Sequence, residues 1–173
     1  VLVFQPAEEG GGGKVILLER GAFEGVDAAM MVHPGVKAMT ARGGIAANLL
    51  RFEYFGKPAH ASSSPDKGIN ALDACIQTFN SINALRQHVT PDVRIHGIIT
   101  HGGDAANVVP KYAAADFIVR AADSDVSLEV VEKVVRCAQA GALAAGAEVK
   151  IHHLEHYAHR IPNPTMARLF GEN

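Results

Sequence analysis

The chain has 173 residues, of which 48% are hydrophobic and 20% are charged, and its 16 basic and 18 acidic residues leave a formal net charge of -2. These values are typical of a globular protein and give no reason to expect a nucleic-acid partner. Its apolar runs are far shorter than the roughly 18 residues that a membrane span needs, so we expect a soluble protein. The length allows one sizeable core, or one compact domain and part of another.

The first residues of the chain and its cysteines indicate what kind of protein it comes from and in which compartment it is found. The sequence opens on Val-Leu-Val-Phe without a methionine and without a signal-peptide pattern, so we expect an internal portion of a longer protein. Cys75 and Cys137 lie in separate apolar, helix-like segments and form no C-x-x-C pair. This indicates reduced core cysteines and a cytoplasmic location.

The first part of the chain has the pattern of a βαβ unit. Residues 1–5 and 27–32 are short apolar runs typical of buried strands, and residues 14–22 carry apolar side chains at roughly helical spacing. Functional groups gather at the carboxyl ends of such strands. The sequence therefore predicts a partial α/β domain over residues 1–44.

From residue 45 the pattern changes to a different fold. Alternation of apolar and polar residues predicts strands, and apolar residues at 3.6-residue spacing predict helices with one buried face. The expected elements are strands near 50–54, 93–100, 113–121 and 148–151 and helices over 72–85 and 128–142. The order β-α-β-β-α-β predicts an α+β domain over 45–158, with two helices on one face of a four-stranded antiparallel sheet. Residues 159–173 are interpreted as a return toward the first domain.

Three polar residues follow the two expected strands of the first part. Glu8 and Glu9 come after the first strand and His33 ends the second. A carboxylate and an imidazole suit zinc, and a second carboxylate can take a proton from metal-bound water. Two solvated loop acids and an incidental histidine are the alternative, because zinc usually has three protein ligands.

The four glycines at 10–13, followed by Lys14, invite comparison with a phosphate-binding loop. That motif needs a glycine where this chain has Glu8, and Ser or Thr where it has Val15. A tight turn past the acids explains the glycines better. A phosphate-binding enzyme is therefore the weaker alternative.

Three further residues of the α+β part are candidates for substrate contact. His60 lies in a turn of small residues after a strand, where it is either a surface residue or a functional group. Asn107 and Arg120 can together bind a carboxylate; the alternatives are a turn residue for Asn107 and a sheet-surface charge for Arg120. His152, His156 and His159 have helical metal-ligand spacing, but the preceding strand and Pro162 favour a polar strand end and loop instead.

Five stretches taken together resemble one family. They are Phe-Gln-Pro-Ala-Glu-Glu-Gly (4–10), Val-His-Pro-Gly (32–35), Gly-Lys-Pro-Ala-His-Ala-Ser (56–62), Gly-Ile-Asn-Ala-Leu-Asp-Ala (68–74) and Gly-Gly-Asp-Ala-Ala-Asn-Val-Val-Pro (102–110). In this order they resemble the dinuclear-zinc aminoacylase and carboxypeptidase family, in its amidohydrolase and dipeptidase branch. The resemblance implies hydrolysis of an amide bond in N-acyl amino acids or dipeptides, with two Zn²⁺ ions per site in the parent enzyme, or Mn²⁺ or Co²⁺ in their place.

The resemblance also implies a role for each candidate. In the catalytic part, Glu8 matches the general base, and Glu9 and His33 match metal ligands. In the lid, His60 matches a histidine that reaches the partner's active site in a homodimer and stabilises the oxyanion. Asn107 and Arg120 match groups that hold the substrate carboxylate.

The chain also departs from the family pattern. It lacks an upstream segment rich in His, Cys and Asp and a further downstream histidine, and two ligands do not make a tight zinc site. We therefore expect this polypeptide alone to be inactive. The main alternative function is a non-catalytic dimerisation or ligand-sensing module, since this fold serves many roles.

Overall fold

The computed structural model describes residues 2–7 and 10–173. These form two compact units, one made of Val1–Gly44 and His159–Asn173 and the other of Ile45–Ala158. We refer to them as unit 1 and unit 2.

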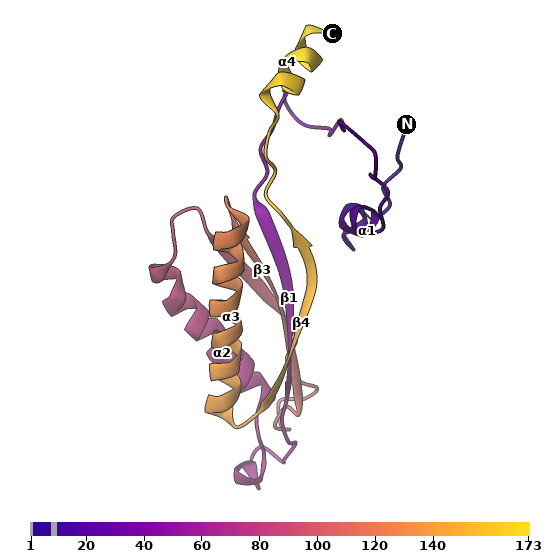
Figure 1. Cartoon of the computed structure of the whole chain (residues 1–173). Helices are drawn as coiled ribbons and strands as arrows, with labels where there is room; N and C mark the ends of the chain where they lie inside the picture. Colours follow the sequence, from indigo (N-terminus) through magenta and orange to yellow (C-terminus); the bar gives the residue numbers. More distant parts are fainter. Residues whose placement is uncertain (1, 8–9) are drawn as a thin grey trace. The chain divides into compact units, whose positions relative to one another are not determined.

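Unit 2 has the element order expected from the sequence. Its elements are β1 (Ala46–Phe55), η1 (Pro65–Lys67), α2 (Ala71–Leu85), η2 (Arg86–His88), β2 (Arg94–His101), β3 (Tyr112–Ala121), α3 (Ser124–Ala145) and β4 (Glu148–Tyr157). The strands lie in the order β2-β3-β1-β4, and every neighbouring pair is antiparallel. Helices α2 and α3 pack side by side on one face of the sheet (Figure 1). The predicted α+β fold is confirmed.

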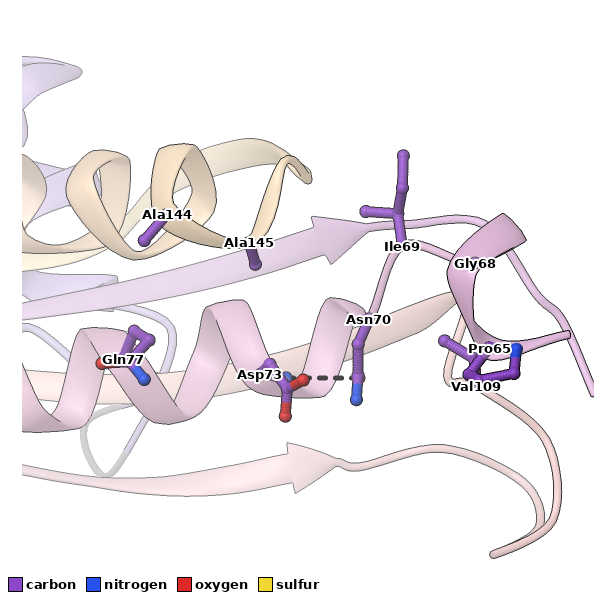
Figure 2. A pocket seen from close by; sticks show the side chains of 9 residues that line it. All are labelled: Pro65, Gly68, Ile69, Asn70, Asp73, Gln77, Val109, Ala144 and Ala145. Atoms are coloured by element: carbon purple, nitrogen blue, oxygen red, sulfur yellow. Dashed lines mark hydrogen bonds between the residues drawn. The ribbon is translucent and has the colours of Figure 1, made fainter. Parts of the chain in front are cut away.

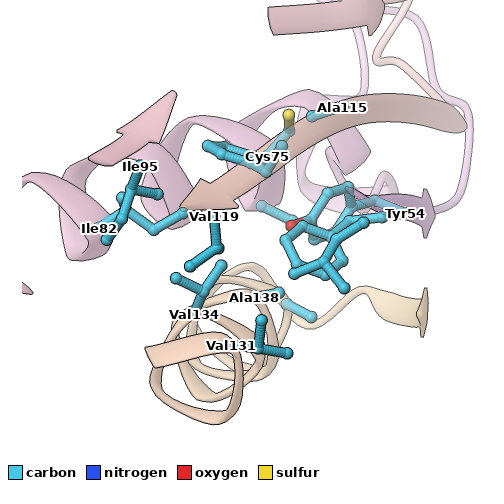
Figure 3. Packing of buried hydrophobic residues seen from close by; sticks show 14 of the residues in the cluster. Tyr54, Cys75, Ile82, Ile95, Ala115, Val119, Val131, Val134 and Ala138 are labelled. Atoms are coloured by element: carbon cyan, nitrogen blue, oxygen red, sulfur yellow. The ribbon is translucent and has the colours of Figure 1, made fainter. Parts of the chain in front are cut away.

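The core of unit 2 lies between the sheet and the two helices. Every second residue of β1 points into it, and Leu50, Phe52 and Tyr54 are fully buried. Phe117 and Val119 of β3 lie beside them, and Val134 and Ala138 of α3 close the layer (Figure 3). Burying one large apolar side chain contributes about 1.5–3 kcal/mol, so the alternation itself fixes which face of the sheet the helices cover.

Helices α2 and α3 approach each other closely at Gly141. A Cβ atom there would lie 2.4 Å from Thr78 Oγ1 and 2.6 Å from the Ala74 carbonyl oxygen. The Thr78 hydroxyl donates to that carbonyl at 3.0 Å and accepts from the Tyr54 hydroxyl at 2.7 Å. The crossing therefore needs a residue without a side chain.

Both helices begin at a side-chain cap. Asn70 Oδ1 accepts from the backbone N–H of Leu72, and Asp123 Oδ1 accepts from that of Asp125. Such caps satisfy N–H groups that have no partner within the helix. Asp123 and Asn70 thus fix where α3 and α2 begin.

In its described residues, unit 1 contains two helices, α1 (Gly13–Glu19) and α4 (Pro164–Glu172). The expected helix is present as α1, but the strands predicted over 1–5 and 27–32 are not formed in the described part of those ranges. Buried parallel strands need neighbouring strands and covering helices. Residues such as Phe4 and Val32 are instead more than 80% exposed.

Among the described residues, none of the helices combines the length and apolar content required to cross a lipid bilayer.

Candidate functional site

The described residues on either side of the two expected acids form tight turns. Glu8 and Glu9 themselves lie outside the described residues, but their flanks are defined. Ala7 has a φ of 56°, a left-handed conformation that costs a non-glycine residue about 1–2 kcal/mol, and the Gly13 N–H donates to its carbonyl at 3.4 Å. A Cβ on Gly13 would lie 1.8 Å from the Pro6 carbonyl oxygen. The glycine run is therefore explained by a tight turn, as predicted.

His33 is exposed and carries one defined hydrogen bond. Its Nδ1 lies 2.7 Å from the carbonyl oxygen of Pro34. A carbonyl can only accept, so Nδ1 carries the proton and Nε2 keeps its lone pair. This is the tautomer that a metal-ligating histidine requires, with the other ring nitrogen held by a backbone carbonyl.

His33 lines a cleft of about 320 Å³ within unit 1. The cleft is formed by two segments, near 29–42 and 161–170, and four methionines contribute to its wall: Met30, Met31, Met39 and Met166. In the described residues no three His, Cys, Asp or Glu side chains come together as a metal site. His33 is nevertheless suited to bind a metal through Nε2, which leaves the remaining ligands to groups beyond those described.

His60 lies in the loop after β1, with its ring exposed. Its Nδ1 is approached by three groups: the Ser62 N–H at 3.3 Å, the Ser62 hydroxyl at 3.2 Å and the Ser63 N–H at 3.4 Å. Within the described part of the chain, no hydrogen bond to Nε2 is present. One nitrogen of the ring is thus engaged and the other faces outward.

The structure brings Asn107 next to His60. The loop after β1 and the loop before β3 run antiparallel, with a bridge between His60 and Val108. The Ala61 N–H donates to the Asn107 carbonyl at 3.0 Å, and the Val109 N–H donates to the Ala59 carbonyl at 2.9 Å. We call this pair of loops, residues 56–64 and 102–111, the paired loops.

Arg120 lies in β3, at the end of that strand farther from the paired loops. It is paired with Ala47 of β1 and with Arg94 of β2. Its Nε atom is buried and has no hydrogen-bond partner among the described residues. From Tyr112 to Arg120 the strand spans about 26 Å at about 3.3 Å per residue. Within one subunit, Asn107 and Arg120 therefore do not form one carboxylate site.

A second polar cluster occupies the open face of the sheet, opposite the helices. Glu53 accepts from the Tyr112 hydroxyl at 2.7 Å and lies 2.6 Å from His152 Nε2. The pKa of Glu53 is lowered chiefly by the hydrogen bond from Tyr112 and then by the contact with His152. The same hydrogen bond raises the pKa of Tyr112. Next to it, Arg51 and Asp116 form a bidentate ion pair at 2.7 and 2.8 Å. This cluster was not predicted from the sequence, although the alternation in β1 places Arg51 and Glu53 on one face.

The histidines near the end of the chain do not act together. His152 contacts Glu53, whereas His156 donates from Nδ1 to Asn48 Oδ1 at 2.7 Å. Strand β4 extends to Tyr157, so these histidines belong to a strand rather than to a helix. The interpretation as a polar strand end is the one that the structure supports.

Unit 2 also has a cleft of about 500 Å³ between the first turns of α2 and the last turn of α3. Its polar wall includes Asn70, Asp73 and Gln77 (Figure 2). Asn70 is already used there, because it caps α2 through the N–H of Asp73 at 3.2 Å. None of the candidate site residues lines this cleft.

The geometry defines unit 2 as an α+β module of the split βαβ type. In the sequence it lies between the two segments of unit 1, residues 1–44 and 159–173. A family model described as "Peptidase dimerisation domain" matches residues 40–145. The chain is 37% identical over its whole length to the Xaa-Arg dipeptidase of Mus musculus, and covers 40% of that protein. It is 32% identical to a p-aminobenzoyl-glutamate hydrolase component of Escherichia coli (strain K12), with 93% of this chain and 34% of that protein covered.

Among solved structures, an aminobenzoyl-glutamate utilization protein from Klebsiella pneumoniae has the same fold. Its TM-score is 0.81 at 24% identity, covering 95% of this chain and 44% of that chain. The chain belongs to the M20 family of peptidases and amidohydrolases and carries its dimerisation domain. The resemblance inferred from the sequence is confirmed. The chain spans well under half the length of the relatives it matches.

Proposed function

We propose that this chain is part of a metal-dependent hydrolase that cleaves an amide bond in N-acyl amino acids or dipeptides. Residues 1–44 and 159–173 would belong to its catalytic domain, and residues 45–158 to a lid through which two subunits dimerise. The names of the relatives, a dipeptidase and an aminobenzoyl-glutamate hydrolase, support this class of substrate. The apolar side chains exposed in unit 1, such as Phe4 and Val32, would pack against the rest of the catalytic domain.

The paired loops carry this proposal. They hold an exposed imidazole and a carboxamide-bearing residue on adjacent, hydrogen-bonded backbones. Neutral donors fixed in this way suit the stabilisation of the negative oxygen that develops when water attacks an amide carbonyl. We assign the oxyanion contact to His60 and a substrate contact to Asn107.

The catalytic part would hold the metal. His33 would bind through Nε2, because its Nδ1 is engaged by the Pro34 carbonyl, and Glu9 would supply a carboxylate ligand. Glu8 would accept a proton from the attacking water. A bound Zn²⁺ supplies a lowered water pKa and a polarised carbonyl. Mn²⁺ or Co²⁺ would serve as well, since ligand type alone seldom selects among them.

Arg120 and the paired loops would act in one active site only when they come from different subunits. The strand that separates them in one subunit spans about 26 Å from Tyr112 to Arg120. In a homodimer, Arg120 of one subunit would bind the substrate carboxylate while the paired loops of the other would cover the scissile bond. The buried Nε of Arg120, which lacks a partner in the described chain, supports its assignment to an anionic group.

The cysteines support a reducing compartment such as the cytoplasm. Cys75 is buried and Cys137 half-buried, and both are free thiols. Burial raises the pKa of Cys75 to about 11, which keeps it protonated and unreactive.

The test uses the complete open reading frame that encodes this chain. The purified enzyme should hydrolyse N-acyl amino acids or dipeptides, lose this activity to a chelator and regain it with Zn²⁺. Glu8→Gln should lower kcat at least about a hundredfold with metal content unchanged, whereas His33→Ala should lose metal. Retained activity after complete metal removal would refute the proposal. A full-length dimer that binds amino acids without hydrolysing any amide would favour the ligand-sensing alternative.

A further inference from the structure

The Nδ1 atom of His60 is surrounded by hydrogen-bond donors. Two of the three groups near it are backbone N–H groups, of Ser62 at 3.3 Å and of Ser63 at 3.4 Å. A backbone N–H can only donate, so Nδ1 must present its lone pair to them. The Ser62 hydroxyl, at 3.2 Å, then donates to the same lone pair.

This arrangement places the single proton of the neutral ring on Nε2. A proton on Nδ1 would point at two N–H groups, which disfavours that tautomer. The ring is exposed, and Nε2 has no hydrogen-bond partner in the described part of the chain. His60 thus presents an N–H donor outward.

The backbone of the paired loops keeps these donors in place. His60 forms a bridge with Val108, and the Ala61 N–H donates to the Asn107 carbonyl. These contacts hold the backbone of His60 and Ala61, the two residues directly before Ser62. Ser62 then contributes the one side chain among the three contacts. The two N–H groups and the hydroxyl together favour the tautomer with the proton on Nε2, and the hydroxyl, at 3.2 Å, is the nearest of the three donors to Nδ1.

We infer that Ser62 is a positioning residue, which orients the His60 ring and keeps its proton on Nε2 so that Nε2–H donates to the oxyanion formed during amide hydrolysis. The catalytic consequence rests on the function proposed above, whereas the tautomer does not depend on it.

A serine next to an imidazole can also be a nucleophile and its base. Here the Nδ1 lone pair is shared with two backbone N–H groups, so it is poorly placed to remove a proton from the Ser62 hydroxyl. The structure assigns Ser62 the role of a donor to the ring, and no covalent intermediate is required.

The direct test is nitrogen NMR of the ¹⁵N-labelled 173-residue chain, at a pH where His60 is neutral. We expect an unprotonated Nδ1 and a protonated Nε2 in the unmodified chain. Ser62→Ala should bring the two ring nitrogen shifts closer together, as the tautomers mix and the ring becomes mobile. Ser62→Thr, which keeps the hydroxyl, should preserve the separation. A major Nδ1–H form, or shifts unchanged by Ser62→Ala, would overturn the inference.

Kinetics of the full-length enzyme provide the second measurement. Ser62→Ala should lower kcat about threefold to tenfold with KM nearly unchanged, and Ser62→Thr should restore it. Ser81→Ala is the control, because Ser81 lies in α2 and outside the paired loops, and it should change neither kcat nor the NMR shifts of His60. Complete loss of activity in Ser62→Thr and Ser62→Ala alike would identify Ser62 as a nucleophile and contradict the positioning role. The NMR result stands whether or not the enzyme hydrolyses amides, so the two proposals fail separately.

Discussion

Asn107 and Arg120 lie toward opposite ends of strand β3, because Asn107 is in the loop before the strand and Arg120 is its next-to-last residue. The paired loops and Arg120 therefore belong to opposite ends of unit 2. Both have features of substrate-binding groups, since one end offers an exposed imidazole and the other a buried guanidinium nitrogen that has no hydrogen-bond partner among residues 2–7 and 10–173. One subunit cannot bring both ends to the same small substrate.

The two histidines of the proposed site have opposite tautomers. The Pro34 carbonyl holds the proton of His33 on Nδ1 and frees Nε2 as a ligand. The N–H groups of Ser62 and Ser63 keep the proton of His60 on Nε2 and make it a donor. The local backbone thus suits one imidazole to bind a cation and the other to stabilise an anion.

We predict that Gly141→Ala destabilises unit 2 by about 1–3 kcal/mol. Alanine favours a helix over glycine by about 1 kcal/mol, but its Cβ would meet the Ala74 carbonyl oxygen at 2.6 Å. That oxygen belongs to the backbone of α2 and cannot move alone, so the clash outweighs the gain. Urea unfolding followed by circular dichroism measures the change. Ala140→Leu, on the exposed side of α3, is the control and should stay within about 0.5 kcal/mol of the unmodified chain.

The hydroxyl of Tyr54 gives a second stability prediction. It donates to Thr78 Oγ1 at 2.7 Å inside the core, and burial raises its pKa. Tyr54→Phe should cost about 0.5–1.5 kcal/mol, because one buried hydrogen bond is lost while Thr78 keeps its bond to the Ala74 carbonyl. Tyr54→Leu should cost more, since it also leaves a cavity. Equal stability of the phenylalanine variant and the unmodified chain would show that this bond contributes nothing.

Glu53 predicts a dependence of stability on acid pH. Its pKa is lowered by the Tyr112 hydroxyl and by His152, with Lys150 also nearby. A lowered pKa in the folded state contributes stability above the pKa of the unfolded chain, about 4.3, and this contribution is lost as pH falls through the folded value. Glu53→Gln should therefore flatten the fall in unfolding free energy below about pH 4.3. Asp92, whose pKa is lowered chiefly by the Ala122 N–H, will keep part of the slope in the variant.

The 173-residue chain itself should not hydrolyse amides. Two of its residues, Glu9 and His33, match metal ligands of the family, whereas catalytic zinc sites usually have three protein ligands. We expect no hydrolysis of dipeptides or N-acyl amino acids by the purified chain with added Zn²⁺. Metal-dependent turnover that is abolished by Glu8→Gln would contradict this prediction.

The sequence predicts unit 2 well because its patterns are set by local physics. Alternation in β1 and the 3.6-residue spacing in α2 and α3 each indicate one buried face, and these faces meet in one core. Helix α4 was missed, although Asn163 as a cap followed by Pro164 at the first helical position is a recognisable start signal. The strands expected in unit 1 need partner strands that are distant in the sequence. The pattern of apolar residues within each segment is therefore not enough to predict that these strands form.

The candidate site was predictable in part. The family resemblance proposes His60 and Asn107 as site residues, but it could not reveal that their loops are hydrogen-bonded to each other, nor that Arg120 lies at the far end of the sheet. Ser62 was visible only as part of a motif. Its contact with a ring nitrogen depends on the direction of two backbone N–H groups, which residue types alone do not specify.

Mixed dimers of the full-length enzyme test the central claim most directly. His60→Ala and Arg120→Ala homodimers should each be nearly inactive, because every site lacks one group. When the two variants are combined, about half of the dimers are mixed and each has one complete site, so activity should recover to about one quarter of that of the unmodified enzyme. If mixed dimers form, as judged by differently tagged subunits, yet activity stays at the level of the two variants, then His60 and Arg120 do not meet across the dimer interface.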